Sequence, residues 1–486
     1  MLTRLRTRRS DRSRRAQAPR VPALVVGAGA AGQSLVRALR RDPAADLAPV
    51  GFLDDNDLLS RVCGLPVLGG TDEIGEVAAQ RGARVALLAI PSLPQARVAD
   101  LVERAWAAGL AVRALPPGGA AVQDLREMRL SRLMGRDEVT LASGRARHLV
   151  TNKRVLVTGA GGVIGSALCH QLTRLDPAAL CMVDQDPFEL RRLRLEISGA
   201  GRLGRDRITS ARTDVRDRAG ITRIFGDVRP DLVFHAAHYR RLSELERDPC
   251  EGVLTNVRGT QHVVDAAVDC KVKRLTLVST DKAADPASVF GATKRLSELV
   301  LQANAGGPTC FAAVRIGDVI GSPGSLLSTL VEQIVRNETI TITHPDVARH
   351  FMTVEEAAGL VLEATALAED AETFVLDMGD PVPVVELVHR YAEQLRVPQV
   401  TIRFSGLGPG EKLAEKVFSD TERRVPTAHP KVWATRSTPL PAFLPQRLDS
   451  LYGAAGCGDE DTTRTMLRRL LPEYQPLRRP ECKVIK

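Results

Sequence analysis

The chain has 486 residues, which is too long for one compact core and indicates two or three domains. Its formal net charge of +9 is concentrated at one end, because eight arginines and one aspartate in residues 1–20 contribute +7 and leave +2 for the remainder. A body of nearly balanced charge with only 3% aromatic residues argues against nucleic acid as a partner.

The arginine-rich residues 1–20 are predicted to form a disordered tail, with an anionic membrane surface or an oligomer contact as alternative roles. No apolar export segment follows the arginines, and no window approaches 18 uninterrupted apolar residues. The eight cysteines are scattered and none forms a Cys-x-x-Cys pair. We therefore expect reduced thiols, no metal site, no transmembrane segment and a cytoplasmic location.

The first predicted domain covers residues 21–117 and alternates strands with helices. A strand at 23–26 leads into a G-x-G-x-x-G loop at 27–32 and a helix that extends to about residue 40. Further strands are expected at 50–53, 67–68, 85–90 and 111–113, with a helix at 94–108. This alternation predicts a doubly wound parallel sheet of the Rossmann type. The glycine loop, with Asp54 ending the next strand, could bind a nucleotide or could be retained without a ligand.

A second alternation follows a predicted linker at 118–150 and defines a catalytic domain at 151–435. Strands are expected at 153–157, 179–183, 208–213, 232–234, 275–278 and 311–314. From about residue 317 the alternation weakens, which predicts a smaller substrate-binding lobe over the site. Residues 436–486, rich in proline and charge, are expected to be a C-terminal tail. The predicted fold class is α/β, with two Rossmann-like doubly wound domains and a small lobe on the second.

A glycine-rich loop in the second domain predicts a dinucleotide site. Gly159, Gly162 and Gly165 follow a strand and open a helix, which lets the backbone approach a pyrophosphate at a helix N-terminus. Asp184 ends the next strand, where a carboxylate would accept hydrogen bonds from the adenosine ribose. We therefore predict NAD, and keep NADP as the less favoured alternative because of the arginines at 191–192. The predicted cofactor site also includes Val163, Ile164, Asp214, Ala236, Ala237 and Lys294.

The end of the strand at 275–278 carries the candidate catalytic residues. Asp281 and Lys282 place a carboxylate beside an ammonium group, and such a pair can move two protons at neighbouring carbon atoms. Lys294, on the following helix, is a cation suited to hold the nicotinamide ribose. Phe290 stands where a short-chain dehydrogenase has the tyrosine of Tyr-x-x-x-Lys. The plainer alternatives are a solvated loop pair and a surface lysine.

These residues resemble the polysaccharide-biosynthesis (CapD-like) branch of the extended short-chain dehydrogenases, the nucleotide-sugar 4,6-dehydratases that act on UDP-N-acetylglucosamine. The resemblance covers about 21–435. The similar segments are 159–166, 235–237, 279–283, 291–295, 343–346, 349–353, 374–379 and 409–412. Many longer members of this branch also carry N-terminal membrane helices, which we do not expect here.

The resemblance implies that NAD oxidises sugar C4 and later reduces C6, which leaves a 4-keto-6-deoxy sugar. Lys282 would remove the C5 proton, and Asp281 would protonate the departing C6 hydroxyl. Since Phe290 has no hydroxyl, Asp281 would also be the base at C4, with Thr280 as a supporting contact. The residues expected to contact the nucleotide sugar are Arg240, Arg241, Arg349 and Lys412, the last with a structural ion pair as its alternative. A homo-oligomer is expected.

The sequence also departs from the family pattern. The segment 239–244 replaces one that usually contains Lys-His-x-Pro, Asp318 stands where asparagine is typical, and Gly408 replaces an arginine. These departures leave two other functions open. One is a nucleotide-sugar epimerase or oxidase with the same 4-keto chemistry, and the other is an inactive regulator that binds NAD and a nucleotide sugar.

Overall fold

The structure is a computed structural model, and the residues it describes are 20–42, 45–56, 58–90, 101, 104–105, 108, 110–115, 126–127, 144–199, 203–320, 330, 333, 338–394, 399–435 and 439–477. The chain divides into two compact units. The first contains Met1–Met128 and Gln394–Arg396, and the second contains Arg129–Glu393 and Val397–Lys486. The boundary after residue 128 falls inside the stretch 118–150 that we expected to be a linker.

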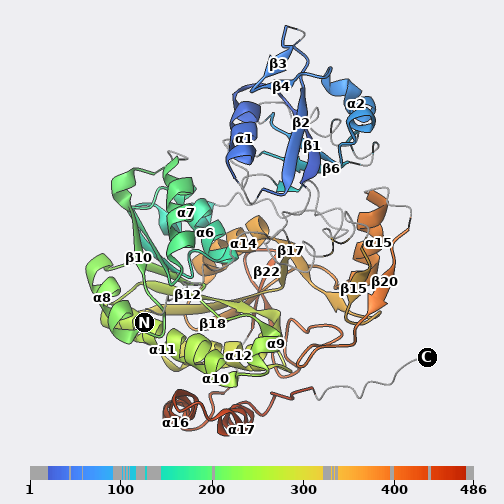
Figure 1. The fold of residues 1–486 in the computed structure, drawn as a ribbon. Coiled ribbons are helices and arrows are strands. Elements are labelled where there is room, and N and C mark those ends of the chain that lie inside the picture. The colour runs from blue at the N-terminus through green and yellow to red at the C-terminus, as the bar shows by residue number, and fades with distance from the viewer. Residues whose placement is uncertain are drawn as a thin grey trace, which may run out of the picture. The chain divides into compact units, whose positions relative to one another are not determined.

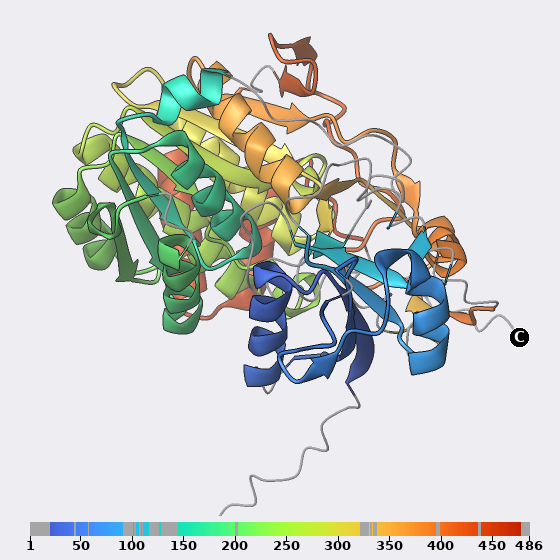
Figure 2. The ribbon, with the colours of Figure 1, turned by 90° about the horizontal axis from the view of Figure 1, so that it is seen from above.

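The first unit is built on a five-stranded sheet in the order β2-β1-β5-β6-β7. The strands are β1 (Val21–Val26), β2 (Leu47–Leu53), β5 (Val85–Leu88), β6 (Ala111–Ala114) and β7 (Arg126–Glu127), and a small hairpin joins β3 (Arg61–Val62) to β4 (Leu65–Pro66). All pairs in the sheet are parallel except β6 with β7. Helices α1 (Ala30–Arg41) and α2 (Ile74–Arg81) lie on opposite faces, as Figures 1 and 2 both show. The helix expected at 94–108 lies largely outside the described residues.

Alternation along β1 explains why both faces of this sheet are covered. Val25 packs in one apolar cluster with Leu35 of α1, whereas Leu24 packs in another with Val77 of α2. Successive side chains of a strand point to opposite faces, so a continuous apolar run is typical of a parallel sheet buried on both sides. The first unit therefore has the α/β architecture predicted from its alternating strands and helices.

The second unit contains a nine-stranded sheet in the order β10-β9-β8-β11-β12-β13-β18-β22-β21. The strands are β8 (Arg154–Thr158), β9 (Ala179–Asp184), β10 (Ile208–Arg212), β11 (Leu232–His235), β12 (Arg274–Thr280), β13 (Cys310–Ile316), β18 (Glu372–Leu376), β21 (Arg424–Pro426) and β22 (Val432–Thr435). The first seven run parallel, and β22 and β21 add antiparallel strands at one edge. The order reverses at β8, which has β9 on one side and β11 on the other. Ligands of doubly wound folds bind at such a reversal.

Helices cover both faces of this sheet (Figure 1). One layer consists of α5 (Gly144–Val150), α6 (Val163–Leu172), α7 (Pro187–Gly199) and α14 (Val354–Leu367). The other consists of α8 (Arg218–Val228), α11 (Gly259–Asp269) and α12 (Val289–Ala303), with the short helices α9 (Leu242–Leu245) and α10 (Pro249–Gly252) beside them. Val157 packs towards the first layer and Leu156 towards the second, so this sheet is also buried on both sides.

Beyond β13 the chain forms short strand pairs that make up the expected smaller lobe. These are β14 (Asp318–Ile320) with β17 (Phe351–Thr353), β15 (Ile340–Ile342) with β20 (Ile402–Phe404), and β16 (Ala348–Arg349) with β19 (Val382–Pro383), followed by α15 (Val384–Gln394). Because β14 follows directly from β13, this lobe starts at the carboxyl end of a central strand.

The stretch 436–486, which we expected to be a C-terminal tail, contains two helices, α16 (Leu444–Gly456) and α17 (Glu460–Leu470). Leu451 and Leu467 are fully buried in the same apolar cluster as Leu296 of α12. Figure 1 shows both helices beside α10, with which they are in contact. The proline and charge content of this stretch concealed an apolar stripe that packs on the domain.

Seven cysteines are described and all are free thiols, of which Cys457, at the end of α16, is exposed. Within the described ranges every helix is too short or too polar to span a lipid bilayer. The same ranges contain no group of three His, Cys, Asp or Glu side chains that could hold a metal ion.

Candidate functional site

The predicted catalytic residues lie in a turn between β12 and α12. The strand ends at Thr280, and a 3₁₀ turn at Asp281–Ala283 follows it. Ser288 caps α12, with its hydroxyl accepting a hydrogen bond from the Gly291 N–H at 3.0 Å. A Cβ atom at Gly291 would lie 2.2 Å from the Lys282 carbonyl oxygen, so only glycine allows the helix to start this close to the turn. The helix start thereby fixes the backbone of Lys282.

Lys282 lies between two carboxylates. Its Nζ donates to Asp281 Oδ1 at 3.1 Å and to Asp318 Oδ1 at 3.0 Å. The side chains of Asp281, Lys282 and Asp318 are 1%, 16% and 37% exposed, so exposure rises from the first to the last. Asp281 Oδ2 is buried and has no hydrogen-bond partner among the described residues. This oxygen of the carboxylate therefore keeps an unused capacity to accept a hydrogen bond or a proton.

Burial and these contacts shift the pKa values of the three groups in different directions. Burial raises the pKa of Asp281, and the nearby Asp318 charge adds to the rise while Lys282 opposes it. Burial alone would lower the pKa of Lys282, but Asp281 and Asp318 raise it above its ordinary value. Burial would raise the pKa of Asp318, yet Lys282 holds it below the ordinary value. At neutral pH the lysine is an ammonium ion, and of the two carboxylates Asp281 takes up a proton more readily.

The position expected to carry a tyrosine is apolar. Phe290 is buried, and its ring centroid lies 5.9 Å from that of His238. A ring nitrogen of His238, Nδ1, lies 2.9 Å from the Ala236 carbonyl oxygen, and burial, together with Lys294, lowers the pKa of His238 to about 3. The histidine is neutral at physiological pH and its Nδ1–H donates to that carbonyl. Phe290 itself has no group that can exchange a proton with a ligand.

Lys294 is buried in α12 and donates from Nζ to the Val278 carbonyl oxygen at 2.8 Å. Burial lowers its pKa to about 8, although Glu298 acts in the opposite direction. Lys294 lies one helical turn beyond Phe290 on α12, and its side chain lies against the last residues of β12. Its expected contact with a nicotinamide ribose stays a prediction.

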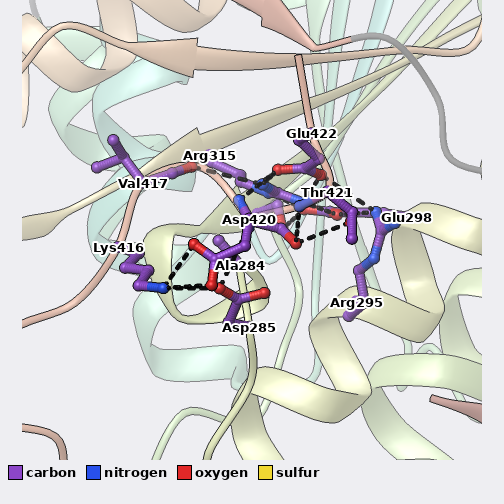
Figure 3. Close-up of polar contacts among 12 residues, drawn as sticks. Ala284, Asp285, Arg295, Glu298, Arg315, Lys416, Val417, Asp420, Thr421 and Glu422 are labelled. Atoms are coloured by element: carbon purple, nitrogen blue, oxygen red, sulfur yellow. Dashed lines mark hydrogen bonds and ion pairs between the residues drawn. The ribbon is translucent and has the colours of Figure 1, made fainter. Parts of the chain in front are cut away.

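A buried group of charges behind the turn at 281–283 was not found from the sequence. Arg315 and Glu298 are fully buried and form a bidentate ion pair. Arg315 Nε and Nη2 donate to the two carboxylate oxygens of Glu298 at 2.9 and 2.8 Å. Glu422 accepts from the other side of the same guanidinium at 2.6 Å, and Figure 3 shows the three side chains together. Burial alone would raise the pKa of Glu298, but Arg315 lowers it to about 2. Buried charges persist only when paired in this way.

This group of charges reaches the turn at 281–283 through Ser279. The Ser279 hydroxyl donates to Glu298 Oε1 at 2.7 Å, only two residues before Asp281. Arg295 adds a second cation to Glu298 at 3.0 Å. The signal that could have found the group is an arginine at the end of the apolar strand β13, since such a charge needs a buried partner.

A second set of contacts fixes the chain directly after the turn. Lys412 Nζ donates to the carbonyl oxygen of Asp285 at 2.6 Å, and Lys416 Nζ forms an ion pair with the Asp285 carboxylate at 3.3 Å. Asp420 accepts from Lys416 and also donates its own N–H to Asp285, as Figure 3 shows for this cluster. The segment 412–422 therefore holds the turn from one side.

Arg349 and Lys412, expected to contact a nucleotide sugar, are engaged with protein groups. Arg349 Nη2 donates to Glu411 at 2.8 Å, and its Nε lies 3.7 Å from Asp318 Oδ2. Lys412 also lies 3.4 Å from Glu415 Oε2, an ion-pair distance without hydrogen-bond geometry. Substrate binding by Arg349 and Lys412 stays a prediction. The contacts of Lys412 support its alternative, structural role.

The other two predicted substrate residues, Arg240 and Arg241, precede the short helix α9. Arg241 is largely exposed and pairs with Glu244 at 2.8 Å. Tyr239 also donates its hydroxyl to Glu244. The segment 239–244 is therefore closed on itself by Glu244, and its contact with a sugar stays a prediction.

The predicted cofactor residues come together at the carboxyl ends of β8, β9 and β11. Gly159 adopts a left-handed conformation with φ of +65°, and a Cβ atom there would lie 2.5 Å from the Ala237 backbone nitrogen. Gly162 then starts α6 at Val163, and Ile164 and Gly165 form its first turn, without a side-chain cap among the described residues. The first N–H groups of this helix are consequently available to a phosphate. These residues fit a dinucleotide.

The acidic residues of the predicted cofactor site lie at two neighbouring strand ends. Asp184 Oδ2 accepts from the Gly161 N–H at 2.9 Å, which places this carboxylate directly beside the glycine loop. Asp214 follows β10 and pairs with Arg216 at 2.6 Å. Burial would raise the pKa of Asp214, but the hydrogen bonds from Arg216 lower it, so the carboxylate is ionised.

The glycine loop of the first unit has a similar local design. Asp54 at the end of β2 accepts from the Ala28 N–H at 2.6 Å, as Asp184 does from Gly161. No catalytic group accompanies this loop among the described residues of the first unit. Both alternatives, nucleotide binding and a retained fold, stay open for it.

Comparisons with known proteins show which families and relatives this chain is similar to. A family model described as "Polysaccharide biosynthesis protein" matches residues 155–437, and one described as "CoA-binding domain" matches residues 1–116. The chain is 34% identical over 423 residues to the probable polysaccharide biosynthesis protein EpsC of Bacillus subtilis, covering 84% of this chain and 70% of that protein. It is 33% identical over 423 residues to the capsular polysaccharide biosynthesis protein CapD of Staphylococcus aureus, with the same coverage.

A similar solved structure is that of Pen from Bacillus thuringiensis. It is 28% identical in sequence, has a TM-score of 0.55, and covers 60% of this chain and 89% of its own. The match thus extends over more than half of the chain, in agreement with the α/β fold of the second unit.

Proposed function

Because the chain belongs to the polysaccharide biosynthesis protein family, we propose that it is a nucleotide-sugar 4,6-dehydratase that acts on UDP-N-acetylglucosamine or a related UDP-hexose. The product would be the 4-keto-6-deoxy sugar, for use in polysaccharide synthesis. The observation that carries the proposal is the buried Asp281 beside the Lys282 ammonium at the end of a central strand. An adjacent acid and base are required to eliminate water across neighbouring carbon atoms.

The proposed cofactor is NAD, which when bound would supply a reversible two-electron oxidation and reduction of the sugar. The glycine loop from Gly159 to Gly165 would hold its pyrophosphate, and Asp184 would accept from the adenosine ribose. Lys294 would approach the nicotinamide ribose from α12. The carboxylate of Asp184 disfavours a 2′-phosphate, which supports NAD over NADP.

The residues of this chain would then move the protons. Asp281 would accept the proton of the C4 hydroxyl, since Phe290 offers no hydroxyl. Lys282, in its amine form, would take the C5 proton while the C6–O bond breaks, and Asp281 would return its proton to the leaving oxygen to form water. Lys282 would then give its proton back to C5. The raised pKa of Asp281 supports this role, because a carboxyl that readily holds a proton can also donate it.

Mass spectrometry of products tests the proposal. The purified protein is incubated with NAD and a panel of UDP- and TDP-hexoses, with UDP-N-acetylglucosamine first. We expect a product that has lost one water, with no net consumption of NAD. A product of unchanged mass would indicate an epimerase, and a product that has lost two hydrogens would indicate an oxidase.

A regulator that binds both ligands without turnover is the second candidate. It is supported by Phe290 and by the protein partners of Arg349 and Lys412, which a phosphate would have to displace. This candidate predicts saturable binding of NAD and a nucleotide sugar in titration calorimetry, with no new product in any member of the panel.

A further inference from the structure

Asp318 is the second carboxylate that forms an ion pair with Lys282, beside Asp281. Its Oδ1 lies 3.0 Å from Lys282 Nζ, and it comes from β14 rather than from the turn that carries Asp281. Unlike Asp281, Asp318 is 37% exposed and so lies where a ligand or solvent reaches it. The carboxylate is thus a more accessible member of a three-group chain, Asp281–Lys282–Asp318.

Other charged groups from every neighbouring segment face these three. Arg349 of β16 lies 3.7 Å from Asp318 Oδ2, and His350 also lowers the pKa of Asp318. Glu415 acts on Lys282 and is itself paired with Lys412. The nearest carboxylates to the ammonium are still Asp281 and Asp318, since they alone among the described residues form ion pairs with it.

We infer that Asp318 is a positioning residue that holds Lys282 between two carboxylates and keeps it charged, so that the amine forms only when this contact is broken or neutralised. The inference rests on the proposed function for its meaning, because Lys282 has to be an amine before it can take the C5 proton. An opposite charge within 4–6 Å changes the pKa of a group by about one to three pH units. Asp318 would therefore set the pH above which the lysine works as a base.

Competitive acetylation in the protein without substrate measures this directly, because only the amine form of a lysine reacts. Trace acetic anhydride is applied from pH 7 to 11, and the labelled peptides are quantified by mass spectrometry. We expect Lys282 to react about tenfold faster at pH 9 in Asp318→Asn than in the wild type, which corresponds to a shift of about one pH unit. Asp318→Glu retains the negative charge and should keep the low reactivity.

Two controls separate this effect from a general loosening of the fold. Lys294 is buried elsewhere in the same unit, so an unchanged Lys294 rate shows that Asp318→Asn remains folded. Lys273 pairs with Asp231 at 3.1 Å before the start of β12, at the other end of that strand. The variant Asp231→Asn should change the labelling of Lys273 and leave that of Lys282 as in the wild type.

Identical pH dependence of Lys282 labelling in the wild type and Asp318→Asn would overturn the inference. In turnover assays the rising limb of kcat/KM should move to lower pH in Asp318→Asn and stay in place in Asp318→Glu. If Lys282 labelling shifts but no nucleotide sugar is converted, the proposed function fails and the role of Asp318 stands. If turnover occurs and labelling does not shift, the reverse holds.

Discussion

Lys282 and Lys294 are 12 residues apart and have opposite electrostatic surroundings. Lys282 lies between two carboxylates and its pKa is raised, whereas Lys294 contacts a carbonyl oxygen and burial lowers its pKa to about 8. Glu298, which acts against the effect of burial on Lys294, already accepts hydrogen bonds from Arg315 and so compensates the lysine only in part. The first lysine is held as an ammonium ion, and the second can lose its proton close to physiological pH.

This difference predicts a pH-dependent contribution of Lys294 to stability. Between its folded pKa of about 8 and the ordinary value of 10.5, the unfolded chain binds a proton that the folded chain does not, so stability rises with pH in that window. From pH 7.5 to 9.5 the free energy of unfolding should gain about 2 kcal/mol from this residue. Urea unfolding of the wild type and Lys294→Met at both pH values measures it as the change in their difference. A difference that is constant with pH would contradict the assignment.

The proposed catalytic pair, Asp281 and Lys282, predicts that its loss affects the chemistry and not the binding of the cofactor. Asp281→Asn keeps the shape of the buried side chain but removes its ability to accept a proton, and Lys282→Met removes the base. Each should lower dehydration by about 10²- to 10⁴-fold. NAD affinity, measured by titration calorimetry, should remain within a few fold of the wild type. Undiminished turnover in either variant would be incompatible with the proposed roles.

At the scale of elements, the turn at 281–283 and the loop after it are held by segments that follow them by more than a hundred residues. The segment 412–422 contacts Asp285, and beyond α17 the backbone N–H of Gln475 donates to the Pro286 carbonyl oxygen at 3.0 Å. The C-terminal helices thus anchor the segment after α17, and this segment is hydrogen-bonded to the loop between the turn and α12. The non-glycine Asp285 has φ of +43°, a conformation that such contacts on both sides can sustain.

The packing of α16 predicts a large and local stability effect. Leu451 is fully buried against the main core, so Leu451→Ala should lower the free energy of unfolding by about 2–5 kcal/mol. The matched control is Leu440→Ala, because Leu440 is exposed just before the same helix and its loss should cost no more than about 0.5 kcal/mol. Urea unfolding followed by circular dichroism compares the two. Equal effects would mean that α16 does not pack on the core in solution.

Across the whole molecule, the sequence was informative where the signal is local. Strand and helix alternation predicted both parallel sheets, and the glycine loop before Asp184 predicted the cluster at the ends of β8 and β9, since these features follow from backbone periodicity and chain order. The pairing of Arg315 with Glu422 could not be read this way, because it joins residues 107 positions apart. The two C-terminal helices were missed for a similar reason, since their apolar stripe is meaningful only beside the core it covers.

The division into two units makes a prediction about their independence. Every predicted catalytic, cofactor and substrate residue lies in the second unit, which has its own two apolar clusters. A fragment of residues 144–477 should therefore fold and bind NAD with an affinity within about threefold of the full chain, a difference of less than 1 kcal/mol. Titration calorimetry on both proteins provides the comparison. A folded fragment that fails to bind NAD would show that the first unit contributes to the cofactor site.

The exposed thiol of Cys457 gives experimental access to the C-terminal helices. Thiol-reactive dyes attach fastest to accessible cysteines, and Cys169, Cys181 and Cys250 are withdrawn from such reagents by burial. In a Cys482→Ser background, a fluorophore at Cys457 would sit at the junction of α16 and α17. The polarisation of its fluorescence would show in real time whether these helices remain packed on the domain while ligands bind near the turn at 281–283.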